Sequence, residues 1–341
     1  MLTRRNFLAG ASALVIVAPA CAATYPDRPI HILVGYAAGG GVDLVARLLS
    51  EPMKAALGQP VIVENRTGAS AMIASNVVAK AAPDGYTLLA AASGEVAINQ
   101  HLFKDKMTYD ARRELTPVAL IGVVPCVVVV ATSTPVHNPK ELIDYAKANA
   151  GKLSFSSSGV GNPQQLAGEL MNSMAGTNVL HVPYRGSAPA VTDVATGAVT
   201  MSFSSLAAAL PLINAGKLRA VAVTSRDHMP QLPDVAPLSE GAPGLKDYEL
   251  INWFGMFATG GTPLEIIDWL NSIINTALKD PAIANKLIPL GIVPRPMNAV
   301  EYKKLWTQRP RSSERLSCRP ILNWRTSDDF GLFSNSLGAN R

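Results

Sequence analysis

Cysteine is scarce in this sequence of 341 residues. There are three, Cys21, Cys126 and Cys318, and Cys21 lies in an N-terminal segment that we expect to be removed. The other two are too few for the disulfide framework of a small secreted domain. Cys126 lies in the apolar run Val123–Ala131, so we interpret it as core material.

Excess charge is absent from the body of the chain. The formal net charge is +5, but residues 1–23 contribute Arg4 and Arg5 without an acid. Residues 309–341 contribute six arginines against Glu314, Asp328 and Asp329, so the two ends supply +2 and +3. Residues 24–308 are therefore neutral. Since a nucleic-acid-binding protein carries its basic excess on the folded body, we expect no nucleic-acid partner.

Long hydrophobic runs are missing after the first 23 residues, so we expect a soluble mature protein. Residues 1–23 themselves combine a basic start, the apolar run Phe7–Ala18 and Ala20-Cys21-Ala22, which fits a signal cleavage site near Ala22. The arginine pair resembles a twin-arginine signal, with an ordinary secretory signal as the alternative. A membrane anchor would need a longer run, and lipid attachment at Cys21 is a lesser alternative. We predict export to the periplasm.

From Ile30 onward, short β-branched runs alternate with amphipathic stretches, which predicts βα units and a mostly parallel sheet. The predicted strands are Ile30–Ala37, Pro60–Glu64, Tyr86–Ala92, Val123–Ala131, Leu153–Ser156, Val179–Val182, Val199–Phe203, Leu218–Thr224 and Asn252–Ala258. Helices are predicted over Leu44–Leu57, after a cap at Asn138, and over Ile266–Leu278 after a start signal at Thr262-Pro263.

Two glycine-rich turns connect a predicted strand to a predicted helix, at Gly35–Asp43 and at Ser156–Gln164. Glycine lets the backbone approach a ligand closely, and a helix start offers unpaired N–H groups with partial positive charge. Together the turns could hold a carboxylate without an arginine. The alternative is that both are ordinary βα turns. Neither fits a dinucleotide or P-loop pattern.

A third strand-to-helix connection, His181–Ala190, adds Tyr184, Arg185 and Ser187 as candidate donors. Arg185 could pair with a carboxylate or could be a solvated surface residue. Catalytic patterns are missing, because the five histidines lack metal-ligand spacing and no H-E-x-x-H, C-x-x-C or G-x-S-x-G occurs. Asp43 and Glu95 could form a carboxylate pair, but Asp43 at a helix start favours a capping role.

Seven separated motifs resemble the Bug family, the extracytoplasmic receptors of tripartite tricarboxylate transporters. They extend in order from residue 24 to about 305, and they are Tyr25–Ile30 (YPDRPI), Gly39–Asp43 (GGGVD), Val63–Arg66 (VENR), Ala82–Leu88 (APDGYTL), Ser157–Gly161 (SSGVG), Val182–Gly186 (VPYRG) and Gly216–Ala220 (GKLRA).

The resemblance implies a solute-binding protein of the Venus-flytrap type, which closes two α/β lobes on an organic acid, an amino acid or an aromatic carboxylate. Each lobe has a mixed, mostly parallel sheet flanked by helices. Backbone amides and hydroxyls of the glycine loops would hold the carboxylate. Carried over by position, the candidate ligand-binding residues are Tyr36, Ala38, Gly39, Gly40, Asp43, Ser93, Glu95, Ser157, Ser158, Gly161, Tyr184, Gly186, Ser187 and Ser204.

The same comparison implies a discontinuous first lobe, 24–124 and 226–308, and a second lobe, 125–225, with crossovers near Val124 and Thr224 and a hinge there. It implies a monomer that works with membrane permease subunits, uses no cofactor or metal, and is not an enzyme. Two readings remain as alternatives, a periplasmic α/β enzyme that acts on small acids and a sensor component that presents ligand.

Two departures from the family pattern stand out. Family members carry an aspartate where this chain has Ser204, which bears on ligand preference. Arg309–Arg341 lacks helical periodicity and lysine and resembles an out-of-frame translation, so we predict a frameshift near residue 307. The chain would then lack a helix that covers the first lobe and would be poorly stable.

Overall fold

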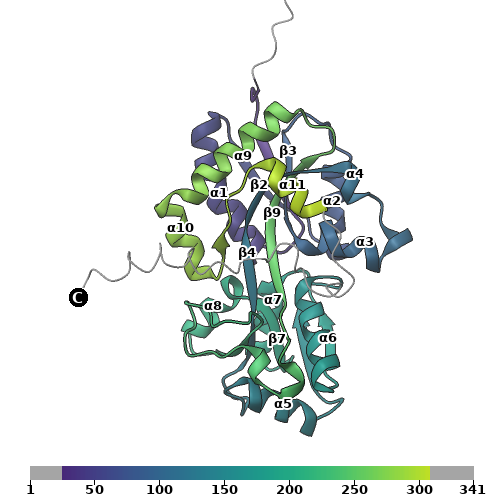
Figure 1. The fold of residues 1–341 in the computed structure, drawn as a ribbon, viewed down its shortest axis with the longest axis vertical. Coiled ribbons are helices and arrows are strands. Elements are labelled where there is room, and N and C mark those ends of the chain that lie inside the picture. Colours follow the sequence, from purple (N-terminus) through teal and green to yellow (C-terminus); the bar gives the residue numbers. More distant parts are fainter. Residues whose placement is uncertain (1–24, 308–341) are drawn as a thin grey trace, which may run out of the picture.

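Strand β4 (Leu115–Ala131) joins the two halves of the structure, a computed structural model that describes residues 25–307. Its first part, up to Pro125, pairs antiparallel with β9 (Ile251–Thr259). Its last part pairs antiparallel with β7 (Met201–Ser205) and β8 (Leu218–Val223). The two lobes in Figure 1 therefore share β4, and β9 runs beside it between them.

The sheet of the first lobe has the strand order β2-β1-β3-β9-β4, and the short β10 pairs with β4. Strands β1, β2 and β3 are parallel, and β9 runs antiparallel to β3. The remaining elements of this lobe are β1 (Ile30–Val34), β2 (Val61–Asn65), β3 (Thr87–Ala92), β10 (Val293–Pro294), α1 (Gly41–Leu57), α2 (Met72–Ala79), α3 (Asn99–Leu102), α4 (Ala111–Glu114), α9 (Leu264–Lys279), α10 (Pro281–Leu287) and α11 (Ala299–Thr307).

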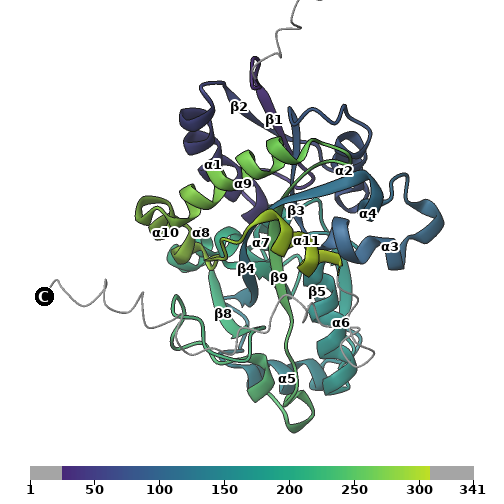
Figure 2. The ribbon, with the colours of Figure 1, turned by 45° about the horizontal axis from the view of Figure 1, so that its top comes forward.

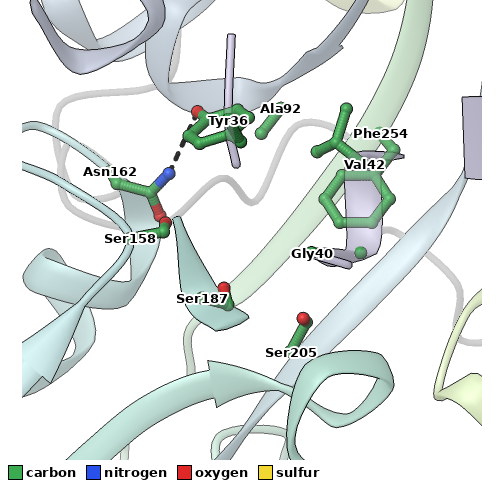
Figure 3. Close-up of a pocket in the computed structure, with 10 residues that line it drawn as sticks. Tyr36, Gly40, Val42, Ala92, Ser158, Asn162, Ser187, Ser205 and Phe254 are labelled. Carbon is green, nitrogen blue, oxygen red and sulfur yellow. Dashed lines mark hydrogen bonds between the residues drawn. The ribbon is translucent and has the colours of Figure 1, made fainter. Parts of the chain in front are cut away.

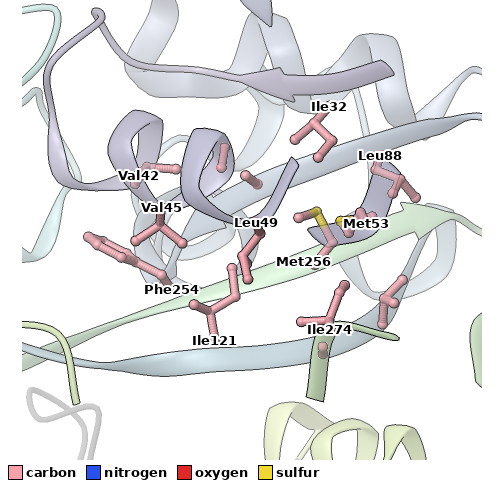
Figure 4. Close-up of a cluster of buried hydrophobic side chains, with 14 of the residues drawn as sticks. Ile32, Val42, Val45, Leu49, Met53, Leu88, Ile121, Phe254, Met256 and Ile274 are labelled. Carbon is pink, nitrogen blue, oxygen red and sulfur yellow. The ribbon is translucent and has the colours of Figure 1, made fainter. Parts of the chain in front are cut away.

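Each face of this sheet buries its own hydrophobic cluster, because successive strand residues point to opposite faces. On one face Leu88 packs with Leu49 of α1 and Ile274 of α9 (Figure 4). On the other face Leu89 packs with α2 and with Tyr302 of α11. The first lobe is therefore a sheet between two helical layers.

The second lobe repeats this three-layer arrangement around the strand order β6-β5-β7-β4, with β8 also paired to β4. Helices α5 and α6 cover one face, and α7 and α8 cover the other. The elements are β5 (Ser154–Ser157), β6 (Leu180–Pro183), α5 (Pro139–Ala148), α6 (Pro163–Ala175), α7 (Ser187–Ala195) and α8 (Leu206–Asn214).

The segment between β8 and β9 belongs with the second lobe. Leu238, Leu245, Tyr248 and Leu250 are buried in the hydrophobic cluster that also contains α5 and α6. The apolar residues of this loop complete the core under α6, and the chain then enters β9 at Ile251. The lobe boundaries at 124, 125, 225 and 226 stay a prediction.

The predicted two-lobed α/β fold is confirmed, and each of the nine predicted strands overlaps an observed one. β4 starts eight residues earlier than predicted, since Pro117 lies at a register shift, where a strand tolerates proline. Asn138 caps α5 as predicted, by accepting a hydrogen bond from the backbone N–H of Glu141. The predicted cap at Thr262 is wrong, because its hydroxyl bonds the carbonyl of Thr259 and Pro263 precedes the helix.

Cys126 is buried, as predicted. Within residues 25–307, no helix combines the length and the apolar character needed to cross a bilayer. The predicted export signal, 1–23, and the atypical tail, 309–341, lie outside the described residues.

Candidate functional site

Four helices begin around one small cavity between the lobes. Helix α1 follows β1 in the first lobe, while α6, α7 and α8 follow β5, β6 and β7 in the second. Helices α7 and α8 lie at the junction of the lobes, and α8 contacts α1 (Figure 2). The cavity has a volume of about 20 Å³ and is lined by Tyr36, Gly40, Gly41, Val42, Ala92, Ser158, Asn162, Ser187, Ser205 and Phe254 (Figure 3).

The β1–α1 loop is held in shape by Asp43, which is 2% exposed. Its carboxylate accepts hydrogen bonds from the backbone N–H of Gly39 at 2.9 Å and from Asn65 Nδ2 at 2.9 Å, and it pairs with Arg47. Burial opposes the charge, but these hydrogen bonds outweigh it and lower the pKa of Asp43. Asp43 therefore positions the loop and does not line the cavity.

The two loops of the second lobe are tied together by Gln164. Its Oε1 accepts a hydrogen bond from the backbone N–H of Ser158 at 2.8 Å, and its Nε2 donates to Ser187 Oγ at 2.9 Å. Asn162 caps α6 by accepting a hydrogen bond from the N–H of Gln164. Ser158 and Ser187 are thus fixed relative to each other before any ligand arrives.

Ser157 is buried and does not line the cavity. Its hydroxyl is 2.7 Å from Nε2 of His181 and also contacts the carbonyl of Gly159. Burial lowers the pKa of His181 to about 4, so this imidazole is neutral at pH 7. Through Gly159, the Ser157 hydroxyl fixes the shape of the β5–α6 turn.

The lobes touch each other through Tyr36 and the neighbouring Ala37. Asn162 Nδ2 of the second lobe donates to the phenol oxygen of Tyr36 at 3.1 Å (Figure 3). The backbone N–H of Ala37 donates to the carbonyl of Arg185 at 2.8 Å. At Gly186, φ is +150° and an added Cβ would lie 2.9 Å from the nitrogen of Ala37. The structure is therefore a closed form in which the absence of a side chain at Gly186 permits contact.

Glu95 lies behind Tyr36 and is 1% exposed. Tyr36 donates a hydrogen bond to its Oε2 at 2.5 Å, and the backbone N–H of Ala92 donates to its Oε1 at 2.8 Å. Burial raises the pKa of Glu95 to about 7, although these hydrogen bonds act in the opposite direction. A titrating carboxyl is thus connected through one phenol to the second lobe.

The lining contains no charged side chain among the described residues. Its polar side chains are serine hydroxyls, the Tyr36 phenol and the Asn162 amide, and several lining residues stand at the starts of helices. Helix N-termini carry partial positive charge and unpaired donors, so the cavity favours an anionic group. Residues 25–307 hold no group of three or more metal-ligating side chains.

Four of the predicted binding residues line the cavity, namely Tyr36, Gly40, Ser158 and Ser187. Gly161 and Gly186 lie at the lobe contact, and Ala38 and Gly39 are exposed on the rim of the first loop. Glu95 and Ser93 lie behind Tyr36, where Ser93 bonds Asn252 at 2.9 Å. Tyr184 bonds Asp193, and the buried Ser204 bonds the carbonyl of Ser205.

Six lining residues were not predicted. Gly41, Val42 and Asn162 lie inside the quoted loops, and the Asn162-Pro163 pair carries a helix-start signal that marks it. Ser205 ends β7 directly before α8, so it carries the same strand-to-helix signal as the glycine loops without a glycine. Ala92 and Phe254 come from β3 and β9, and only the strand pairing brings them here.

Comparisons with known proteins agree on one family. The model of the tripartite tricarboxylate transporter family receptor matches residues 45–317. A protein from the tcbD–tcbE intergenic region of Pseudomonas sp. (strain P51) is 39% identical, with 85% of this chain and 86% of the relative covered. Protein BugT of Bordetella pertussis is 36% identical, with 82% and 85% covered.

Solved structures give the same result. The binding protein BugD is 34% identical at a TM-score of 0.77, with 83% of this chain and 94% of that chain covered. An R. palustris protein with adipate is 33% identical at a TM-score of 0.79, with 83% of this chain and 93% of that chain covered. MatC of Rhodopseudomonas palustris with bound malate is 31% identical at 0.77, with 83% and 96% covered. The chain belongs to the tripartite tricarboxylate transporter receptor family, and the resemblance to Bug proteins is confirmed.

Proposed function

We propose that this protein is an exported receptor that captures a small carboxylate between its lobes and delivers it to a membrane permease of the tripartite tricarboxylate type. The observation that carries the proposal is the cavity where the N-termini of α1, α6, α7 and α8 converge without a charged side chain in the lining. Backbone and hydroxyl donors at helix starts bind a carboxylate and leave the rest of the ligand open to variation.

In this closed form the cavity has a volume of about 20 Å³, which is room for about one water molecule. A ligand would therefore enter while the lobes are further apart. The relatives with adipate and malate bind acids of this kind, which supports the same class of ligand here. The lobe contacts at Tyr36 and Gly186 would form on closure around the ligand, with bending at the strands that join the lobes.

We infer that the protein acts as a periplasmic monomer, uses no cofactor and performs no reaction on its ligand. The candidate residues Ala38, Gly39, Asp43, Ser93, Glu95, Ser157, Gly161, Tyr184, Gly186 and Ser204 would support the loops and the closure, while Tyr36, Gly40, Ser158 and Ser187 would face the ligand.

A thermal-shift screen of the purified protein tests the proposal. The panel contains mono-, di- and tricarboxylates, amino acids and aromatic acids. The concentration of each is about a hundredfold above a micromolar Kd. A ligand that binds only the folded state adds about 2.7 kcal/mol of stability at a hundredfold excess over its Kd. We expect one class of acid to raise the midpoint clearly. A cooperative melt that no acid shifts would contradict the carboxylate receptor.

Two further readouts separate the alternatives. The acid that raises the melting midpoint is incubated with pure protein and then analysed by NMR. We expect the acid to be unchanged, and its turnover would establish an enzyme. A deletion strain should lose uptake of that acid, whereas retained uptake with a lost transcriptional response would establish a sensor component.

A further inference from the structure

Glu95 is a buried carboxyl of the first lobe and lies directly behind Tyr36. It is 1% exposed and belongs to the π-helix η2 (Gly94–Ile98), a rare turn that is frequent at functional sites. The titratable groups that face it are three phenols, those of Tyr36, Tyr109 in the loop before α4, and Tyr302 of α11. Because no basic side chain faces this carboxyl in the described part of the chain, hydrogen bonds alone stabilise its charge.

Both oxygens of this carboxyl accept hydrogen bonds. Oε2 accepts from the Tyr36 hydroxyl at 2.5 Å, and Oε1 accepts from the backbone N–H of Ala92 at 2.8 Å. These donors fit an ionised carboxyl, which only accepts, whereas a protonated carboxyl also has to donate one hydrogen bond. The N–H of Ala92 cannot accept, so a proton on Glu95 has to be donated to the phenol oxygen of Tyr36.

Donation by Glu95 would reverse the hydroxyl of Tyr36. The phenol proton would then need another acceptor, but the group of the second lobe that faces it, Nδ2 of Asn162 at 3.1 Å, is itself a donor (Figure 3). Rotation of the Asn162 amide would break the cap of α6, because its Oδ1 accepts a hydrogen bond from the N–H of Gln164 at 3.0 Å. Protonation of Glu95 therefore opposes the bond between Tyr36 and Asn162.

The bond between Tyr36 and Asn162 joins the two lobes and exists only while they touch. The backbone beside Glu95 takes part in the same contact, since an added Cβ at Gly94 would lie 3.3 Å from the carbonyl oxygen of Gly161. The hydrogen-bond partners of the Glu95 carboxyl itself belong to the first lobe, so opening removes the Asn162 bond and leaves those partners in place. The open form therefore accepts a proton on Glu95 more readily than the closed form.

We propose that Glu95 is a positioning residue that couples ligand capture to the release of a proton, because its ionised form holds the Tyr36 phenol as an acceptor for Asn162 and so favours the closed lobes. The inference rests on the proposed function, since it assumes closure around a bound acid. Burial raises the pKa of Glu95 to about 7, so the exchange of this proton takes place near neutral pH. Affinity is then lowest where Glu95 is protonated, and it rises with pH as Glu95 ionises.

Isothermal titration between pH 6 and pH 8.5 tests this coupling. The probes are malate, adipate and the acid of the thermal-shift panel that raises the midpoint most. We expect about two- to tenfold tighter binding at pH 8.5 than at pH 6, the range for one hydrogen bond. Titrations near pH 7 in buffers of different ionisation enthalpy should show that binding releases a fraction of a proton. Binding that neither depends on pH nor releases a proton overturns the proposal.

Two variants break the coupling at different points. In Glu95→Gln the amide oxygen can accept from the N–H of Ala92, which leaves the amide nitrogen as a donor to Tyr36, so the variant imitates the protonated carboxyl. Its affinity should stay near the wild-type value at pH 6 over the whole range, without release of a proton. Tyr36→Phe keeps the carboxyl and removes the connection, so its affinity should also lose the dependence on pH.

The matched control is Tyr109→Phe. The Tyr109 hydroxyl bonds the backbone carbonyl of Glu95 at 2.6 Å and not its carboxyl. This variant should lower the melting midpoint and keep both the pH profile of affinity and the release of a proton. A pH profile that survives in Glu95→Gln belongs to another group, such as a histidine, and overturns the proposal.

The outcomes separate this inference from the proposed function. An acid that binds wild-type protein and Glu95→Gln with the same pH profile overturns the coupling and leaves the receptor intact. Failure of every panel acid to bind the folded wild-type protein overturns the proposed function itself. If Glu95→Gln melts without cooperativity, the comparison of wild-type protein with Tyr36→Phe decides, and equal release of a proton by these two proteins overturns the coupling.

Discussion

The phenol oxygen of Tyr36 accepts a hydrogen bond from Asn162 across the lobe junction, at 3.1 Å, while donating its own proton to Glu95. One hydroxyl therefore connects a buried carboxyl of the first lobe to a helix cap of the second. The contact lies on the wall of the cavity, so closure and ligand binding share it.

Removal of this hydroxyl should weaken ligand binding. Tyr36→Phe loses the bond that favours the closed form, and we expect about two- to tenfold lower affinity by isothermal titration, as for a neutral hydrogen bond. The control is Tyr248→Phe, whose buried hydroxyl bonds the carbonyl of Ala167 inside the second lobe. Tyr248→Phe should lower the free energy of unfolding and leave the ligand affinity unchanged. Equal losses of affinity in both variants would refute a closure role for Tyr36.

Added bulk at Gly186 should prevent closure. Gly186→Ala places a Cβ 2.9 Å from the nitrogen of Ala37, so we expect affinity to fall at least tenfold. Gly197→Ala is the matched control, since Gly197 has φ of +81° and open space around its Cβ position. Both variants carry backbone strain from a positive φ, about 1–3 kcal/mol. Unchanged affinity in Gly186→Ala would contradict the closed geometry.

The pH dependence of stability should change sign when Glu95 is replaced. The pKa of folded Glu95 is about 7 against its usual 4.5, so the folded chain holds a proton that the unfolded chain releases. This contribution is complete below pH 4.5 and is lost as pH rises through 7, by about 3 kcal/mol. His181 acts oppositely, because its lowered pKa of about 4 gives stability above pH 6.5 that is lost on acidification.

Urea unfolding from pH 4.5 to 8 checks this prediction. Wild-type protein should show a shallow profile at low pH and a decline toward pH 8. Glu95→Gln keeps only the contribution of His181, so its free energy of unfolding should rise with pH and exceed the wild-type value most at pH 8. Parallel profiles for the two proteins would show that Glu95 does not titrate in this window.

Much of the fold could be predicted from the sequence because each βα unit carries its own local signals. The run Val123–Ala131 is β-branched and predicts a strand, and Asn138-Pro139 predicts a helix start. The first half of β4 was missed because Pro117 and Gly122 usually end strands. Gly122 is needed there because β10 approaches its backbone closely, and no local pattern shows that contact.

The site could be predicted only where a glycine-rich turn marks the loop in the sequence. Tyr36, Gly40, Ser158 and Ser187 lie in or beside glycine-rich turns, and they line the cavity. Ser204 was singled out on β7, yet the side chain that lines the cavity is that of Ser205, one residue on and therefore on the other face of the strand. Phe254 depends on the pairing of β9 with β3 and β4, which the sequence does not specify locally.

The most direct test of the account is a titration that compares the tightest-binding acid with its primary amide at the same carbon skeleton. The amide keeps the size and removes the charge that the four helix N-termini are proposed to hold. We predict that the acid binds at least a hundredfold more tightly than the amide, at pH 7.5 where Glu95 titration is largely complete. Equal affinity for acid and amide would contradict a carboxylate receptor built on helix N-termini.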